Sequence, residues 1–471
     1  MAVVWANAEK AAKLKRRTFM LSRYLIVIFV LSARLISAAD FLAQPYVQLG
    51  ANPAPSAQER LSIVWHANLT KHDWQLEHRT GAGVWKRAAR VLANEIRVRD
   101  TAPFQVLEAQ LEGLKPGARF EYRVLRDGQA LFTASAMARK KRNATTTFAV
   151  WGDCAQGTPG QKQVAEQAAK LNPDYVLIAG DIVYSRGRIS EYREKYFPYY
   201  QDFAKSTLFV GVPGNHDSSN APELEKTPDA FAFYYFWKQP LGGPADAPGP
   251  AMKSTVAGDV EAIRRVSGEA WARAGYFAFD YGAVHWTVLD SSPYADWTKP
   301  ELREWLEADL KANAKAKWRI VSFHHPGFNA SKAHFSDQRM RSISDILERN
   351  HVDLVMSGHV HNYQRSVPLK FQMTSPPEGK KTEVGGEFTF DREYDGVRKT
   401  RPRYPIYVVT GAGGAKLYDP EQTQEKQFQP FTAKFIADTN SFTMVEASTS
   451  KLTVWQVGTT GAELDRFVLT R

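Results

Sequence analysis

The stretch at residues 175–184 reads Y-V-L-I-A-G-D-I-V-Y and decides how we interpret the larger part of the chain. Its apolar run has the length of a buried strand and ends in Gly180-Asp181, with Tyr184 three residues further on. Such a strand would deliver a carboxylate and a phenol together into a polar space. An open α/β sheet presents a binding site in this way, at the carboxyl ends of its strands.

Four other apolar runs end in side chains that can bind metals. These are Asp153 after F-A-V-W-G, Asn215, His216 and Asp217 in G-N-H-D, His324 and His325 after R-I-V-S-F, and His359 and His361 in G-H-V-H. Each motif alone is weak, because Gly-Asp is common in loops and paired histidines often lie on surfaces. Because the carboxyl ends of neighbouring strands share one edge of a sheet, we expect the five clusters to converge there.

Seven of these residues offer metal ligands: Asp153, Asp181, Tyr184, Asn215, His324, His359 and His361. That is more than the about four ligands that one tetrahedral ion takes. Two ions about 3.5–4 Å apart, bridged by one carboxylate, would use all of them, and Asp181 is the bridging candidate. Such a site binds a phosphoryl oxygen and makes hydroxide available near neutral pH, so this pattern favours phosphate-ester hydrolysis.

Residues 1–39 have the pattern of a secretory signal peptide. Seven Lys or Arg against one acid precede or flank an apolar stretch at 24–33, which is followed by the small residues Ser37-Ala38-Ala39. The apolar stretch is about half of the roughly 20 residues that a membrane span needs, so we expect no stable membrane span. The sequence therefore predicts a secreted or periplasmic protein, with an uncleaved interfacial anchor as the alternative.

The leader also accounts for most of the net positive charge of the chain. It supplies +6 of the formal net charge of +11, which leaves only +5 on the rest of the chain. This modest charge does not indicate a nucleic-acid partner, and the sequence leaves the oligomeric state open. Cys154 is the only cysteine, so an intramolecular disulfide is excluded.

Two folded domains are expected after the leader. Residues 40–143 contain short period-two runs that predict strands at 60–69, 74–79, 84–91, 95–100, 120–124 and 131–136. This spacing favours a β-sandwich of immunoglobulin or fibronectin type. Residues 144–471 alternate strand and helix patterns, with helices expected at 161–171, 191–205, 299–314 and 336–350. The basic run at 139–142 is interpreted as a solvated linker near the boundary.

The five motifs together resemble those of purple acid phosphatases, within the calcineurin-like metallophosphoesterase superfamily. The matching residues are G-D at Asp153, G-D-x-x-Y ending at Tyr184, G-N-H-D at 214–217, V-x-x-H ending at His324 and G-H-x-H ending at His361. The resemblance implies an α/β fold, a four-layer sandwich of mixed sheets flanked by helices, at 144–471. It also implies an N-terminal all-β, fibronectin type III-like domain at 40–143.

The resemblance further implies an acid phosphatase. In that family pattern Asp153, Asp181, Tyr184 and His361 would hold Fe(III), while Asp181, Asn215, His324 and His359 would hold a divalent Zn, Fe or Mn. A metal-bound hydroxide would attack the monoester of a small molecule. His216 would contact the phosphate, and His325 or His334 would protonate the leaving group.

One departure from the wider superfamily supports the purple-type branch. Most members carry D-x-H at the first motif, whereas this chain reads Asp153-Cys154-Ala155 and has Tyr184 where that branch takes its ligand. A phenolate is a hard, anionic donor that suits a trivalent ion. Asp217 and Gln364 stand where many relatives carry Glu, which leaves the substrate preference open.

Two alternatives remain open from the sequence. A phosphodiesterase or nucleotidase could use the same scaffold and metals. A surface- or polymer-binding protein with a decayed metal site belongs to another class, but the presence of every expected ligand argues against decay. His285 lies inside an expected strand and is interpreted as a packed residue with no catalytic part.

Overall fold

The computed structural model describes residues 41–220, 223–377 and 382–471. The expected signal peptide lies outside these residues. Within the described ranges, no helix is both long and apolar enough to cross a membrane.

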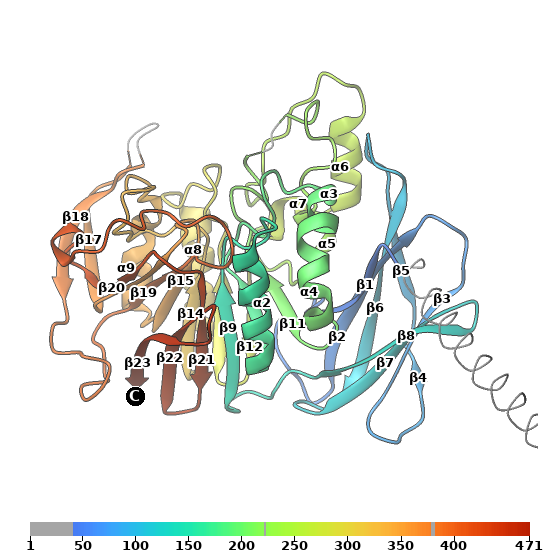
Figure 1. Cartoon of the computed structure of the whole chain (residues 1–471), viewed down its shortest axis with the longest axis horizontal. Helices are drawn as coiled ribbons and strands as arrows, with labels where there is room; N and C mark the ends of the chain where they lie inside the picture. Colours follow the sequence, from blue (N-terminus) through green and yellow to red (C-terminus); the bar gives the residue numbers. More distant parts are fainter. Residues whose placement is uncertain (1–40, 221–222, 378–381) are drawn as a thin grey trace, which may run out of the picture.

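Residues 43–137 form two four-stranded antiparallel sheets that share an apolar core (Figure 1). One sheet has the order β1-β2-β6-β5 and the other β4-β3-β7-β8. The strands are β1 (Ala43–Gln48), β2 (Glu59–Asn68), β3 (Trp74–Arg79), β4 (Lys86–Arg87), β5 (Val91–Ile96), β6 (Phe104–Leu114), β7 (Arg119–Arg126) and β8 (Gln129–Met137). The expected all-β character of this region is confirmed.

Two details of the expected strands in this region were wrong. The run at 84–91 forms only the two-residue strand β4, and the ring of Trp85 beside it contacts the guanidinium groups of Arg79 and Arg123 at 4.5 and 4.4 Å. The strand expected at 95–100 lies instead at Val91–Ile96. The longest strand of the region, β6, was not predicted, since its polar Gln and Glu residues hide its alternation.

A six-stranded mixed sheet carries the first half of the α/β region. Its order is β11-β10-β9-β21-β22-β23, and the first three strands are parallel. The strands are β9 (Thr146–Trp151), β10 (Tyr175–Ile178), β11 (Leu208–Gly211), β21 (Ser441–Ala447), β22 (Lys451–Gly458) and β23 (Glu463–Thr470). The apolar run quoted from residues 175–184 is thus the second parallel strand of this sheet.

A seven-stranded mixed sheet lies beside it, in the order β12-β13-β14-β15-β19-β16-β20. Its four central strands are parallel: β13 (Val284–Val288), β14 (Trp318–Ser322), β15 (Leu354–Ser357) and β19 (Ile406–Thr410). The others are β12 (Phe277–Tyr281), β16 (Tyr363–Ser366) and β20 (Thr432–Ile436), and a separate hairpin pairs β17 (Leu369–Ser375) with β18 (Gly385–Phe390).

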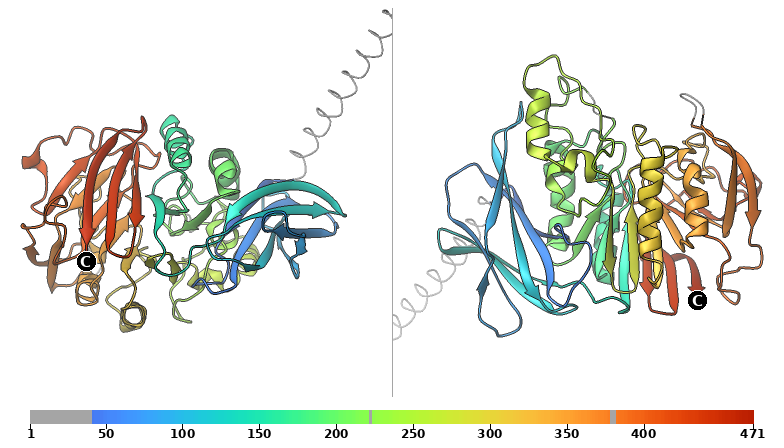
Figure 2. Two further views of the ribbon diagram at one scale, coloured as in Figure 1. Left: turned by 90° about the horizontal axis from the view of Figure 1, so that it is seen from below. Right: turned by 180° about the vertical axis from the view of Figure 1, so that it is seen from behind.

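The two large sheets pack face to face, with helices on their outer sides (Figure 2). Between them, Trp286 lies edge-on to Phe148 at 5.3 Å and donates from its indole N–H to the hydroxyl of Tyr175 at 2.8 Å. The longer helices are α2 (Pro159–Leu171), α4 (Phe197–Ala204), α6 (Asp259–Ser267), α8 (Pro300–Ala312) and α9 (Ser344–Arg349). The expected α/β fold with mixed sheets is confirmed.

Shorter helical segments complete the region. They are α3 (Ile189–Glu191), a π-helical turn (Tyr192–Tyr196), α5 (Phe233–Phe236), α7 (Ala270–Arg273) and 3-10 turns at Arg339–Ile343 and Glu425–Gln427. The helix expected at 191–205 therefore starts at Ile189 and includes a π-helical turn, and the one expected at 336–350 is a 3-10 turn followed by the short α9.

The expected solvated linker at 139–142 was wrong for Arg139, whereas Lys141 and Arg142 are exposed as expected. Arg139 is fully buried and pairs with the equally buried Glu59 at 2.7 Å, and it donates to the carbonyl of Asp280 at 3.3 Å. Lys140 and Arg142 pair with Asp174 and Asp280. Arg139 needs these partners because a buried cation requires a nearby anion or acceptor, and the ion pairs of Lys140 and Arg142 add contacts nearer the surface.

Candidate metal centre

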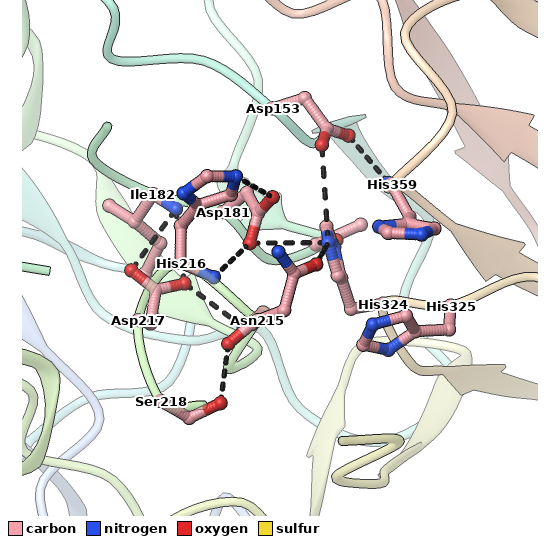
Figure 3. A network of polar contacts seen from close by, with 12 residues as sticks. Asp153, Asp181, Ile182, Asn215, His216, Asp217, Ser218, His324, His325 and His359 are labelled. Carbon is pink, nitrogen blue, oxygen red and sulfur yellow. Dashed lines mark hydrogen bonds and ion pairs between the residues drawn. The ribbon is translucent and has the colours of Figure 1, made fainter. Parts of the chain in front are cut away.

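The five strand-end clusters meet where strands of both large sheets end (Figure 3). Asp153 follows β9, and Asp181 and Tyr184 follow β10. The other side chains are Asn215 and His216 after β11, His324 after β14, and His359 and His361 after β15. The strands are parallel within each sheet, so their carboxyl ends lie along one edge.

Four of the expected ligands form a first group around the phenol of Tyr184. Its hydroxyl donates to Asp153 Oδ1 at 2.9 Å and lies 2.9 Å from His361 Nε2 and 3.3 Å from Asp181 Oδ2. His361 Nε2 is also 3.4 Å from Asp153 Oδ1. The four donor atoms therefore surround one small volume.

A second group forms around His324. Its Nε2 lies 3.2 Å from the other carboxylate oxygen of Asp181, Oδ1, and 3.2 Å from Asn215 Oδ1. The ring of His359 lies beside it, with a centroid distance of 5.1 Å. Asp181 thus belongs to both groups, with one oxygen facing each.

The two histidines that lie against carboxylates are oriented in the same way. The Nδ1 of His324 contacts the carbonyl of Ala179 at 2.8 Å, and the Nδ1 of His361 contacts the carbonyl of Lys416 at 2.7 Å. A carbonyl oxygen only accepts, so each Nδ1 carries the proton and each Nε2 keeps its lone pair in the neutral ring. Metal-binding histidines are commonly fixed by such a second hydrogen bond.

The backbone is strained where it presents the ligands. Asp153, Asp181 and His359 have positive φ angles of 59°, 50° and 68°, which non-glycine residues seldom adopt. Such residues persist only where the surrounding structure holds them, and they cluster at functional sites. Two backbone N–H groups help, since His359 donates to Asp153 Oδ2 at 2.7 Å and His216 to Asp181 Oδ1 at 2.8 Å.

Close packing explains the glycines of two motifs. A Cβ atom at Gly180 would lie 2.3 Å from His324 Nδ1, and one at Gly214 would lie 2.1 Å from Asp181 Oδ1. Both contacts are far shorter than real Cβ contacts. The glycine before each ligand therefore leaves room for a ligand that comes from another strand.

The carboxylates and histidines shift each other's protonation. Burial raises the pKa of Asp181, but the charges of His324 and His216 outweigh it and hold that pKa below its ordinary value. Burial lowers the pKa of His324, yet Asp181 and Asp153 raise it to about 9. Burial and the same two carboxylates raise the pKa of Tyr184 well above its usual range. The site therefore favours positive charge, and a phenolate at Tyr184 requires a cation beside it.

Asp217 supports the ligands from behind. Its side chain is 1% exposed and accepts from the backbone N–H groups of Ile182 at 3.1 Å and Gly214 at 3.0 Å (Figure 3). Burial, and secondarily the charge of Asp181, raise its pKa to about 8. It joins the ends of β10 and β11, so it lies under the site and away from solvent.

His325 and His334, the two expected proton donors, both lie around His359. Their ring centroids are 4.4 and 4.1 Å from that of His359. His325 is buried and its Nδ1 lies 2.9 Å from the hydroxyl of Ser291, whereas His334 is exposed to solvent. Burial, followed by neighbouring histidine charges, lowers the pKa of both.

Three residues near the site were not predicted. Ser291 follows β13 and would have been found by applying the strand-end rule to a sixth strand. Tyr418 stacks on His361 at 4.0 Å and lies 5.5 Å from His334; the only signal for it is the G-A-G-G run after β19. Asp337 lies 4.0 Å from His359 Nε2 in an irregular loop that carries no sequence signal.

The donor set fits a pair of metal ions. Carboxylate, phenol, imidazole and amide donors suit iron, zinc and manganese. The contacting donor atoms of Tyr184, Asp153, Asp181 and His361, and those of His324 with Asp181 and Asn215, lie 2.9–3.4 Å apart. This is the spacing of neighbouring ligands around one ion at about 2.0–2.2 Å. The buried cluster of Asp153, Asp181 and His324, and that of His324, His325 and His359, each place ligand atoms within 4.8 Å of one another.

Comparison with known proteins finds similar sequences. Residues 146–363 match the model of the calcineurin-like phosphoesterase family. Purple acid phosphatase 21 of Arabidopsis thaliana is 25% identical over 279 residues, covering 56% of this chain and 54% of the relative. A phosphoenolpyruvate phosphatase of Allium cepa is 25% identical over 304 residues, covering 60% and 52%. The chain spans about half of the length of the curated relatives it matches.

A solved structure shows the same fold. The purple acid phosphatase PPD1 from yellow lupin (Lupinus luteus) seeds superposes with a TM-score of 0.65 at 17% identity, covering 91% of this chain and 74% of that one. The resemblance seen in the five motifs is thereby confirmed. Residues 146–363 thus match the calcineurin-like phosphoesterase family, and the chain is similar to purple acid phosphatases in sequence and in fold.

Proposed function

We propose that the chain is an acid phosphatase that hydrolyses phosphate monoesters of small molecules with a dinuclear Fe(III)-M(II) centre. Asp153, Asp181, Tyr184 and His361 would hold Fe(III), and Asp181, Asn215, His324 and His359 would hold Zn, Fe or Mn. The observation that carries this proposal is the placement of Asp181. Its Oδ2 lies against the phenol of Tyr184 and its Oδ1 against His324, as a carboxylate between two ions requires.

When bound, the two ions would polarise the phosphoryl oxygen and supply hydroxide near neutral pH. The chain itself orients the phosphate through His216. The Nδ1 of His216 lies 2.7 Å from the carbonyl of Ser185, which fixes the ring, and its Nε2 lies on the site side, 3.7 Å from Asp181 Oδ2. As an imidazolium, His216 can donate from Nε2 to a phosphate oxygen and stabilise its charge.

His334 and His325 differ in what they can do for the leaving group. His334 is exposed beside His359, so a leaving group that extends toward solvent can reach it. His325 is 3% exposed, packs against His359 and is held by Ser291. We assign proton donation to His334 first and to His325 second.

The proposal also covers the kind of domain formed by residues 40–143 and the role of the leader at residues 1–39. Naming its strands A to G with C′ after C, the sheets have the orders A-B-E-D and C′-C-F-G, which supports an immunoglobulin-related, fibronectin type III-like domain at 40–143. The pattern of residues 1–39 supports export to the periplasm or the outside of the cell. The second candidate activity is that of a phosphodiesterase or nucleotidase, which the same donor set would serve.

The test compares kcat/KM for an aryl phosphomonoester and the matching diester from acidic to alkaline pH, using protein whose metal content has been measured. A monoester preference on the acidic side supports the proposal, and a diester preference at neutral or alkaline pH supports the second candidate. Turnover of neither ester by metal-loaded protein would point to a binding protein.

A separate test addresses the iron. Fe(III) bound to a phenolate absorbs visible light, so the purified protein should be coloured and Tyr184→Phe should lose the colour. A colourless wild-type protein with two divalent ions would contradict the assignment of Fe(III) while leaving the activity open.

A further inference from the structure

A buried polar network joins three distant segments beside the metal centre. The segments are the loop at 329–334, which ends in His334, the stretch at 361–364, which starts with His361, and residues 418–422. Gln364 lies at their junction with 4% of its surface exposed. Its Oε1 accepts from the N–H of Ala330 at 2.7 Å. Its Nε2 donates to Oδ1 of Asn329 and to Oδ1 of Asn362, each at 2.9 Å.

Backbone groups fix the orientation of every amide in this network. The N–H of Ala330 can only donate, so it faces the oxygen of Gln364. The N–H of Ser331 donates to Asn329 Oδ1 at 2.8 Å, and the Nδ2 of Asn329 donates to the carbonyl of Ala333 at 2.8 Å. Asn329 therefore presents an oxygen to Gln364, because the opposite orientation would break both bonds.

Asn362 is fixed by the same reasoning. Its Nδ2 donates to the hydroxyl oxygen of Ser331 at 3.2 Å and toward the carbonyl of Tyr418 at 3.4 Å. The hydroxyl of Ser331 itself donates to the carboxylate of Asp419. Residue 364 thus faces one backbone donor and two acceptors, which only a neutral amide satisfies completely.

A carboxylate at this position would meet two oxygens. The oxygen that replaces the wild-type Nε2 would face Oδ1 of Asn329 and Oδ1 of Asn362, with no donor beside it. A buried charge without a partner is costly. Rotation of either asparagine would leave other buried groups unpaired. The charge-neutral Gln364 is therefore a requirement of this chain's own network.

The network sets the position of His334 relative to the metal ligands. Gln364 holds Ala330, Asp419 accepts from the N–H of Ala333 at 2.8 Å, and Gln422 donates to the carbonyl of Ala330 at 2.7 Å. The loop then turns at His334, whose φ is +56° and whose ring lies 4.1 Å from that of His359. Gln364 is three residues from His361, so it links the loop to the ligand-bearing segment.

We propose that Gln364 is a positioning residue, which fixes the loop at 329–334 so that His334 faces the leaving group of the substrate. The proposal rests on the proposed phosphatase function. A catalytic group displaced by about 1 Å can lose up to 100-fold in rate, so small movements of this loop should be visible in the kinetics.

The main experiment compares wild type with Gln364→Glu. At about pH 6, within the acidic range of the proposed activity, we expect kcat/KM to fall roughly 10- to 100-fold for an alkyl phosphomonoester and less for an aryl phosphomonoester, whose good leaving group needs little protonation. The ratio to wild type should recover as the pH falls, because a protonated carboxyl group at this position can donate one hydrogen bond. Metal content should remain at the wild-type value.

A readout without catalysis accompanies the kinetics. Hydrogen exchange of the peptide covering 329–335 should accelerate in Gln364→Glu, while peptides from β10 and β15 remain protected. Gln364→Ala should accelerate the same peptide without the pH-dependent recovery, which keeps the test informative where the Gln364→Glu variant folds poorly.

The matched control is Gln456→Glu in β22. Gln456 is fully buried, accepts from Thr443 and donates to Ser441, but lies outside the network. The Gln456→Glu variant should have a lower melting temperature than wild type and an unchanged ratio of alkyl to aryl turnover. Wild-type exchange at 329–335 in both Gln364 variants, or an equal loss on both esters at every pH, would overturn the proposal. Wild-type protein that is loaded with metal but turns over no ester would instead overturn the proposed function, and exchange would still report on the network.

Discussion

Two buried histidines near β13 and β14 of the seven-stranded sheet show how the same residue type serves different purposes. His324 follows the carboxyl end of β14, and its Nε2 faces Asp181 and Asn215. His285 lies near the amino end of β13, where Nδ1 contacts Asp280 at 2.7 Å and Nε2 contacts Asp309 at 3.1 Å. Both nitrogens of His285 are therefore taken by carboxylates.

The difference lies in what surrounds the Nε2 atom, which meets Asp181 and Asn215 in His324 but only Asp309 among the hydrogen-bond partners of His285. In His324 the Nδ1 atom donates to a backbone carbonyl, which leaves Nε2 available as a ligand. In His285 two carboxylates hold a proton on each nitrogen, so the ring serves as a buried cation. A buried histidine beside acids is thus a metal ligand or an ion-pair partner according to how many other ligand atoms gather at its Nε2, and the following predictions test that rule.

The largest loss of metal and activity is expected when Asp181, the carboxylate shared by both ligand groups, is replaced. Asp181→Asn removes the charge that both groups of ligands use, so both ions should be lost and activity should disappear. Metal analysis and kcat/KM on the same sample measure this. Full activity with normal metal content would contradict the bridging role.

A matched pair separates the two histidines. His324→Gln should lower the metal content by about one ion per chain and remove activity, because one ligand set is incomplete. His285→Gln should leave the metal content unchanged but destabilise the fold by about 3 kcal/mol, since Asp309 loses its cation and Asp280 keeps only Arg142. Metal analysis and chemical denaturation of both variants distinguish the roles. Metal loss in the His285 variant would refute the rule.

A steric pair tests the packing behind the ligands. The Cβ of Gly214→Ala would lie 2.1 Å from Asp181 Oδ1, whereas that of Gly242→Ala would lie 3.7 Å from its nearest neighbour. Neither glycine has a positive φ, so only contact differs between them. We expect about a 10- to 100-fold loss of kcat/KM for Gly214→Ala and wild-type activity for Gly242→Ala.

The smallest effect concerns pH. Burial lowers the pKa of His285, but the carboxylates of Asp280 and Asp309 outweigh it and raise that pKa from 6.5 to about 9. Its stabilising charge is complete below pH 6.5 and is lost as the pH rises through about 9. The difference in free energy of unfolding between wild type and His285→Gln should therefore shrink over this range, by at most roughly 3 kcal/mol. A constant difference would show that His285 stays neutral.

The sequence predicted which side chains gather at the candidate site, because each proposed ligand follows an apolar strand within a few residues. Asp153, Asp181 and His324 share this local pattern, and sheet geometry brings them together. Gln364 and Tyr418 could not be found in this way, since their roles depend on contacts with residues at 329–334 and 361. Those contacts exist only after distant segments have packed.

The errors in the fold have the same cause. Arg139 was interpreted as solvated because nothing local reveals Glu59, which lies 80 residues away and pairs with it in the interior. The strand β6 was missed because Gln105 and Glu108 interrupt its apolar alternation, although both belong to a regular ladder with β2. Local pattern predicts elements well where burial is uniform and poorly where polar residues are paired inside.

Asp280, in β12 of the seven-stranded sheet, also contacts the segment between β1 and β2 of the β-sandwich. Its backbone N–H donates to Pro53 and its carbonyl accepts from Arg139, while its carboxylate contacts Arg142 and His285. Any separation of the β-sandwich from the large sheets must break these backbone bonds and disturb the neighbour of the charged His285. We therefore expect the β-sandwich and the seven-stranded sheet to unfold together. Calorimetry of the intact chain between pH 6.5 and 9 should record one melting transition that releases a proton, because unfolding returns the raised pKa of His285 to its ordinary value.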